Sequence, residues 1–170
     1  EICQKQGIAV KRPGVAADGP ENGPSLTIEV VPGIPALASG AALLGAPLTH
    51  DFAVVSLSDL LTPWDKIEKR IDAAASADFV IVIFNPRSKK RDWQLSKARE
   101  IVLKHRHPDT PVGIVKSAMR EGQAVTITRL ADLDKADVDM LTTVFIGNSA
   151  SVTYLDFMIT PRGYSEKYDL

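Results

Sequence analysis

An uninterrupted apolar run over residues 79–84 constrains the fold of this chain most strongly. Such a run is typical of a strand that is buried on both faces, and that strand needs a covering layer on each side. The helical spacing of apolar residues that begins at Trp64 can supply one such layer. Further apolar strands are expected at 26–31 and 142–146. Alternating helices and apolar strands predict an α/β fold, a mixed β-sheet flanked by helices.

Local signals place the other elements. Pro35 and Pro63 are expected at the first position of two helices, with Thr62 as the cap of the second. Asp92 is expected to cap a third helix. The final apolar segment, 152–158, is compatible with either a strand or a short helix. The sequence also predicts a strand at 53–57, a hairpin of strands 111–116 and 124–128 joined by a turn at 120–123, and a short helix at 130–136.

Three of the apolar strands end in small or proline-bearing segments. These segments are PGIPA at 32–36, NPRS at 85–88 and GNS at 147–149. In α/β proteins, ligands bind at the carboxyl ends of strands, where backbone and small polar groups are presented. We therefore expect one ligand cleft to which all three loops contribute.

The composition narrows the class of protein. A formal net charge of −1 gives no overall field that would attract nucleic acid or a membrane surface. No apolar run is long enough to span a bilayer and no signal segment opens the sequence, so a cytoplasmic protein is expected. The single cysteine, Cys3, rules out an internal disulfide and fits a reducing compartment. The three histidines are scattered, so we expect no metal site.

Five motifs follow one another in a fixed order along the chain. They are VVPGIPALASGAALLGAPLTHDF, LSDLLTPW, FNPRSKKRDWQL, VKSAMREGQ and a closing pair, GNSAS with MITPRGY. Together they resemble the carboxyl-terminal half of the tetrapyrrole methylases, over about residues 25–164. The combination of NPRSKKR with TPRGY is similar to the branch that methylates C-17 of the corrin precursor in cobalamin synthesis.

The resemblance implies a two-domain parent protein. The amino-terminal domain of the family carries a Gly-rich loop and an SGDP-like motif, and neither occurs in this sequence. The opening EICQKQG is typical of a helix tail that ends at a C-cap glycine, Gly7, and residues 11–24 are typical of a Pro/Gly-rich linker. We therefore expect residues 1–24 to be the tail of the absent domain with a linker. Residues 25–170 are expected to form the carboxyl-terminal methylase domain, inactive on its own.

The resemblance also implies the ligands. They are S-adenosylmethionine as methyl donor and a precorrin-3B or cobalt-precorrin-3 tetrapyrrole, whose ring contracts on methylation, bound by a homodimer. Methyl transfer requires positioning, exclusion of water and stabilisation of moving charge, so small and backbone-presenting residues are expected. Met119 is either beside the site or fills the core. By resemblance, the cofactor-binding residues are Pro32, Gly33, Ala36, Asn85, Ser117, Ala118, Leu141, Thr142 and Thr143.

A cluster of cations follows the apolar run. A charge run is ordinarily a solvated loop, but this one follows a buried strand, and planar arginine grips carboxylates in a bidentate manner. A corrin precursor carries many carboxylates, so the expected substrate-binding residues are Arg87, Lys89, Lys90 and Arg91. Acid–base character near strand ends is limited to His50-Asp51 and Ser58-Asp59, and we assign none of them a catalytic role.

Two alternatives remain open at the level of the sequence. One is a non-catalytic ligand-binding or regulatory domain that keeps the same fold. The other is a methylase of the same family that acts on another corrin carbon, although NPRSKKR and MITPRGY count against it.

Overall fold

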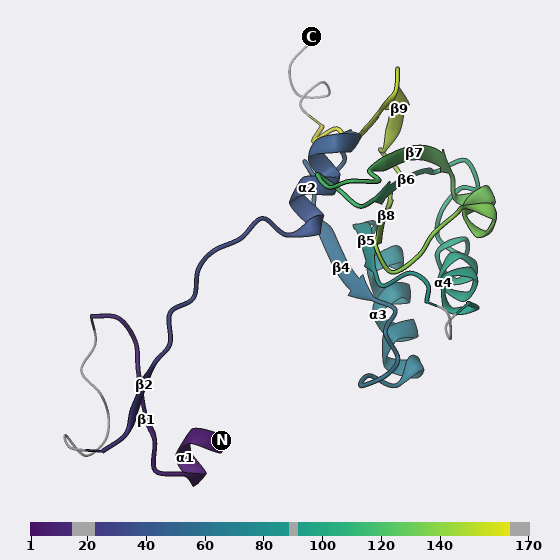
Figure 1. Ribbon diagram of the computed structural model, residues 1–170. Coiled ribbons are helices and arrows are strands. Elements are labelled where there is room, and N and C mark those ends of the chain that lie inside the picture. The colour runs from purple at the N-terminus through teal and green to yellow at the C-terminus, as the bar shows by residue number, and fades with distance from the viewer. Residues whose placement is uncertain (15–22, 89–91, 164–170) are drawn as a thin grey trace. The chain divides into compact units, whose positions relative to one another are not determined.

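The computed structural model describes residues 1–14, 23–88 and 92–163. It contains two compact units, Glu1–Ile34 and Pro35–Leu170, and Figure 1 labels most of their elements. The inference about an absent domain stays a prediction.

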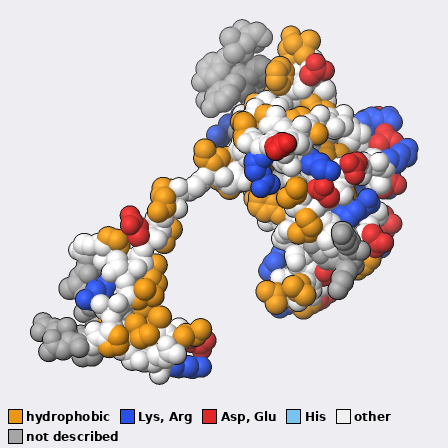
Figure 2. All heavy atoms as spheres, in the orientation of Figure 1, with side chains coloured by type: hydrophobic (Ala, Val, Ile, Leu, Met, Phe, Trp, Pro, Cys, Tyr) orange, Lys and Arg blue, Asp and Glu red, His pale blue; other side chains and the backbone are white. Residues whose placement is uncertain are grey.

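The first unit is small and has little core of its own. It contains helix α1 (Ile2–Lys5) and strands β1 (Ala9–Lys11) and β2 (Ser25–Thr27), which pair in parallel. Gly7 adopts a φ of 66° just beyond α1, as expected for a glycine that ends a helix. Among the described residues of this unit only Ala9 is buried, and apolar side chains lie on its surface (Figure 2).

The second unit is built on a mixed five-stranded sheet. The strands of the whole unit are β3 (Gly45–Ala46), β4 (Phe52–Ser56), β5 (Val80–Phe84), β6 (Pro111–Lys116), β7 (Ala124–Arg129), β8 (Thr142–Ile146), β9 (Val152–Tyr154) and β10 (Phe157–Ile159). The large sheet has the order β4-β5-β8-β6-β7, and a smaller sheet has the order β3-β10-β9. Strands β4 and β5 are parallel, whereas β8 is antiparallel to both β5 and β6. This topology confirms the predicted fold class.

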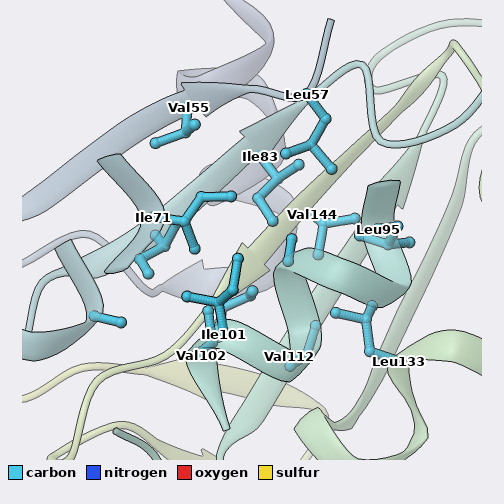
Figure 3. Close-up of a cluster of buried hydrophobic side chains, with 14 of the residues drawn as sticks. Val55, Leu57, Ile71, Ile83, Leu95, Ile101, Val102, Val112, Leu133 and Val144 are labelled. Carbon is cyan, nitrogen blue, oxygen red and sulfur yellow. The ribbon is translucent and has the colours of Figure 1, made fainter. Parts of the chain in front are cut away.

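Helices cover both faces of the large sheet. They are α2 (Ala36–Leu44), α3 (Trp64–Ser76), α4 (Gln94–Val102) and the 3₁₀ helix η1 (Leu130–Lys135). On one face, Ile71 of α3, Ile101 of α4 and Leu133 of η1 join a single apolar cluster (Figure 3). On the other face, Leu44 of α2 belongs to a second cluster that includes Phe145. No helix within the described ranges is long and apolar enough to cross a membrane.

Helix α3 illustrates how the sequence sets these layers. Asp65 lies in its first turn, where a negative charge interacts favourably with the helix dipole. Ile67, Ile71 and Ala74 recur at helical spacing and are all buried. The helix is therefore amphipathic, and its apolar stripe packs against the sheet.

The starts of three helices differ from the sequence prediction by one residue each. Pro35 and Pro63 are N-cap residues rather than the first helical residues. Trp93 is the N-cap of α4, which has no side-chain capping bond from a described residue, so the assignment of Asp92 as its cap was wrong. The Trp93 ring packs edge-on against Trp64, the first residue of α3, at 4.8 Å between centroids.

The first and last strands also differ from the prediction. The strand expected at 26–31 is limited to Ser25–Thr27, and Val30 and Val31 beyond it are exposed. The segment 152–158 forms a hairpin of two short strands rather than one strand or a helix. Leu155 at its tip has a φ of 51°, which reverses the chain between β9 and β10.

Candidate ligand-binding edge of the sheet

One edge of the large sheet collects most of the predicted site residues. Strands β4, β5 and β6 end there, and the antiparallel β8 begins there. The register pairs Ile83 with Val144 and Lys116 with Thr142. We call this edge the site edge. The predicted residues that it brings together are Asn85, Ser117, Ala118, Leu141, Thr142 and Thr143.

The segment 147–149 does not share this edge, and the expectation that it contributes to the same cleft was wrong. Because β8 runs antiparallel to β5 and β6, its carboxyl end lies at the opposite edge of the sheet. There the Gly147 amide donates to the Pro111 carbonyl at 2.9 Å, at the start of β6. Ser149 donates from its amide and its hydroxyl to the carboxylate of Asp78.

The polar groups around Gly147 have a structural role instead. The hydroxyl of Ser151 donates to Asn148 Oδ1 and lies 2.7 Å from the hydroxyl of Thr160. Both of these oxygens and the Asn148 side chain are buried, so the network joins the end of β8 to the β9–β10 hairpin. A Cβ at position 147 would lie 2.5 Å from that of Ser151, which explains the glycine.

The PGIPA segment is divided between the two units. Pro32 and Gly33 belong to the first unit, whereas Ala36 is the first residue of α2 in the second. A Cβ at Gly33 would meet no atom within 4 Å, so packing does not require glycine there. The assignment of these three residues to a cofactor site stays a prediction.

Backbone strain is concentrated at the site edge. Asn85 after β5, and Ser117 and Met119 after β6, have φ values of 53°, 48° and 57°. The left-handed region is costly for residues other than glycine, least so for asparagine, and such strain often marks a functional loop. Met119 is 62% exposed, so the interpretation of this side chain as core filling was wrong.

An ion pair holds the loop that leads into β8. The ammonium group of Lys116 lies 2.8 Å from a carboxylate oxygen of Asp139 and 3.7 Å from one of Asp137. The other Asp139 oxygen accepts hydrogen bonds from the amide of Leu141 and the hydroxyl of Thr142. The bond from Lys116 lowers the pKa of Asp139 below its ordinary value and keeps it ionised. We call this set of contacts the Lys116–Asp139 clamp.

The clamp also determines which groups of β8 a ligand can reach. The amide of Leu141 donates to Asp139, and the carbonyl of Leu141 accepts from the amide of Ser117 at 3.0 Å. The amide of Thr142 donates to the carbonyl of Asp139 at 3.2 Å. These amides are already used, so a ligand at the start of β8 would meet side chains and the second lone pairs of carbonyl groups.

The substitution Lys116→Met is expected to loosen the loop before β8. The side chain stays long and unbranched but loses the charge that holds Asp139, so the amides of Leu141 and Thr142 should exchange with solvent about tenfold faster. Hydrogen exchange measured by NMR tests this. Lys97→Met, which removes an ion pair to Glu100 at 3.0 Å on the surface of α4, is the matched control and should leave both amides unchanged. Unaltered exchange in Lys116→Met would show that the clamp does not hold the loop.

Arg87 lies beside a hollow of about 400 Å³ at the site edge. Its walls are formed by Ser88 and by the loop before β8, including Val138, Met140 and Leu141. The Nε atom of Arg87 is buried and has no hydrogen-bond partner among the described residues. The other three predicted substrate-binding residues, Lys89, Lys90 and Arg91, lie outside the described residues.

The candidate acid–base residues have local partners. Nδ1 of the exposed His50 accepts a hydrogen bond from the Asp51 amide at 2.8 Å. Asp59 accepts from the side-chain amide of the buried Gln94 at 2.9 Å. Both arrangements are those of loop-stabilising contacts, and neither suggests a proton donor.

The fold and this edge define a class of protein. Residues 20–134 match the tetrapyrrole (corrin/porphyrin) methylases, and the chain belongs to this family. Among curated proteins, it is 56% identical over 143 residues to the cobalt-factor III methyltransferase of Priestia megaterium, covering 84% of the chain and 26% of that protein. It is 49% identical over 138 residues to the probable cobalt-factor III C(17)-methyltransferase of Salmonella typhimurium, covering 81% of the chain and 57% of that protein.

A solved structure is also similar to this chain. The crystal structure of the methyltransferase CobJ superposes with a TM-score of 0.73 at 35% identity, covering 81% of this chain and 57% of that one. The chain thus spans little more than half of the Salmonella protein and of CobJ, and about a quarter of the Priestia protein.

Proposed function

We propose that residues 25–170 are the carboxyl-terminal domain of an S-adenosylmethionine-dependent methyltransferase. The parent enzyme methylates C-17 of a precorrin-3B or cobalt-precorrin-3 tetrapyrrole and contracts its ring during cobalamin biosynthesis, as a homodimer. The observation that carries the proposal is the register of the large sheet, because it brings the loops after β5 and β6 beside the start of β8. The names of the relatives specify cobalt-factor III and, in the Salmonella protein, C(17), which favours this carbon over others.

The chemistry of the site edge suits S-adenosylmethionine. Asn85 and Ser117 turn the backbone sharply at two strand ends, which allows close approach of a ligand. The exposed side chains of Met119 and Leu141 offer apolar contact to the nucleoside. We place Ala118, Thr142 and Thr143 in the same site. The amino end of α2 at Ala36 would add amide N–H groups. The resemblance alone supports Pro32 and Gly33 as further cofactor-binding residues.

The role of these residues is to orient the donor rather than to react. Methyl transfer from a sulfonium requires the methyl group to lie in line with the accepting carbon and requires water to be excluded. Half of such a pocket cannot exclude water, so the chain alone should transfer no methyl group. A domain that completes the other wall would be needed for turnover.

The substrate would be held by its carboxylates. The guanidinium of Arg87 is the described cation beside the hollow at the site edge, and its Nε lacks a partner among described residues. A peripheral carboxylate of the tetrapyrrole could accept a charge-assisted hydrogen bond from it. Lys89, Lys90 and Arg91 belong to the same proposed contact region.

The substitution Arg87→Ala tests the assignment. In a chain extended at its amino end to the length of its relatives, KM for the tetrapyrrole should rise about tenfold or more, since a hydrogen bond to a charged group is lost. The Kd for S-adenosylhomocysteine, measured by calorimetry, should change less than about twofold because Arg87 does not contact the donor. Arg129→Ala, at the opposite edge of the sheet, is the control and should change neither.

Two outcomes would redirect the proposal. A larger effect of Arg87→Ala on cofactor affinity than on KM would move Arg87 into the cofactor site. An extended chain that binds S-adenosylhomocysteine but transfers no labelled methyl group to a precorrin-3-type tetrapyrrole would favour the non-catalytic binding domain.

A further inference from the structure

The loop between β4 and α3, residues 57–63, presents two adjacent leucines to solvent. Leu60 is 84% exposed and Leu61 is 93% exposed, whereas Leu57 at the start of the loop is fully buried. Single exposed leucines are ordinary on protein surfaces. Two in succession, in a loop that follows a strand ending at the site edge, are a candidate contact surface.

The loop is held by two hydrogen bonds just before the leucine pair. The amide of Ser58 donates to the hydroxyl of Ser56 at 3.2 Å. The side-chain amide of Gln94, a residue that is buried at the start of α4, donates to Asp59 at 2.9 Å. These bonds restrain the backbone that leads into the leucines, which lowers part of the entropic cost of binding.

A groove beside this loop is lined by a positively charged side chain, that of Arg70. Its volume is about 260 Å³, and Arg70 of α3 lines it together with Val54, Leu60, Leu61, Ser58 and Thr62. Arg70 forms no salt bridge with any described residue. An apolar wall, hydroxyl groups and an unpaired guanidinium together suit a short carboxylate arm on an apolar body.

The loop that carries Arg87 lies beside the leucine loop. Asn85, at the end of β5, donates from its side-chain amide to the hydroxyl of Ser56 at the end of β4, at 2.9 Å. The Gln94–Asp59 bond joins the leucine loop to the first residue of α4, which follows the loop that carries Arg87. The loop that carries Arg87 and the leucine loop therefore begin at neighbouring strand ends of the second unit, and Arg70 lines the groove beside the leucines.

We propose that Leu60, Leu61 and Arg70 form a second substrate subsite, in which the leucines pack on the apolar face of a tetrapyrrole and Arg70 pairs with one of its peripheral carboxylates. This inference rests on the proposed function and adds a second point of attachment to the one at Arg87. The apolar face of such a macrocycle would lie on the two leucines, and the carboxylates around its rim would pair with Arg70 and Arg87. Two attachment points also fix the rotation of the ring about its centre, which a single carboxylate contact leaves free.

The test uses the chain itself and uroporphyrin, a porphyrin with eight carboxylates, as the probe. Trp64 and Trp93 are the only tryptophans of the chain and lie next to the two loops, so bound porphyrin should quench their fluorescence. Arg70→Ala is expected to raise the Kd about three- to tenfold, since one charged hydrogen bond at an exposed site is lost. The double substitution Leu60→Ser with Leu61→Ser is expected to raise it about tenfold through lost apolar contact.

Lys69→Ala is the matched control, because Lys69 is the neighbouring cation on α3 but lines the groove between α3 and α4 instead. It should change the Kd less than about twofold, as a surface charge outside the contact would. Thermal unfolding of each variant checks that it folds, which is expected because the altered side chains are exposed.

The outcomes separate the subsite from the proposed function. If the Arg70 and leucine variants bind uroporphyrin as tightly as the unaltered chain while Arg87→Ala binds more weakly, the subsite is refuted and the proposed function stands. If only one of the two subsite variants matters, the two-part subsite is refuted as stated. If the unaltered chain does not bind uroporphyrin, the subsite and the assignment of a tetrapyrrole to this edge fail together.

Discussion

Arg106→Ala is expected to destabilise the second unit by about 3 kcal/mol, the lower end of the cost of breaking a buried ion pair. Arg106 is 8% exposed, and its guanidinium lies 3.1 Å from Asp78, which is partly exposed. It also donates to the carbonyls of Ala75 and Phe79, between the end of α3 and the start of β5. Burial lowers the pKa of Arg106, and the charge of Asp78 offsets part of this effect.

The effect should be large because the substitution breaks several contacts together. Asp78 has a φ of 61° and also accepts both hydrogen bonds from Ser149, so Arg106 secures the strained turn that connects α3, β5 and the end of β8. Urea unfolding measures the change. Arg106→Lys keeps the charge but loses the planar fork, so its free energy of unfolding should lie between those of the unaltered chain and Arg106→Ala. Lys104→Ala, which removes an exposed cation two residues earlier, should change the free energy of unfolding little. Equal stability of Arg106→Ala and Lys104→Ala would contradict this account.

Gly113→Ala is expected to destabilise the chain by about 1–3 kcal/mol through overpacking. A Cβ at position 113 of β6 would lie 2.4 Å from a methyl group of Leu44, which is fully buried where α2 packs on the sheet. At position 40 the Cβ would lie 2.8 Å from the ring of Phe145. The two glycines are where α2 and the sheet approach each other.

A double-mutant cycle separates overpacking from an effect on strand propensity. If the clash with Leu44 causes the loss, Gly113→Ala should cost almost nothing in a Leu44→Ala background, since the space is then empty. Leu44→Ala alone should cost about 2–5 kcal/mol, as expected for a buried leucine. Additive effects of the two substitutions in urea unfolding would refute the packing explanation.

Much of the large sheet could be predicted from the sequence, because its signals are local. The apolar run of β5, the turn between β6 and β7 and the apolar stripe of α3 each determine their own element. What local patterns do not contain is the direction of a strand within a sheet. Strand β8 is inserted antiparallel between β5 and β6, so the small residues at 147–149 lie at the wrong edge for the predicted cleft, whereas Thr142 at its start lies at the right one.

The finer features of the site depend on contacts between distant residues. Lys116 and Asp139 belong to different strands and loops, and no spacing rule joins them. The left-handed conformation of Asn85 fits the known tolerance of asparagine, but those of Ser117 and Met119 have no such signal. The exposed pair Leu60 and Leu61 is visible as a motif, but only the structure separates it from core leucines such as Leu57.

The central claim is that the site edge, rather than the opposite edge, forms one wall of a pocket for the methyl donor and the tetrapyrrole. NMR chemical-shift mapping of the labelled chain, titrated with S-adenosylhomocysteine to millimolar concentration, tests it most directly because even weak binding to half a pocket is then visible. We expect the largest shifts at residues 85–88, 117–119 and 141–143. Shifts confined to residues 147–151, or no shifts at all, would contradict the claim.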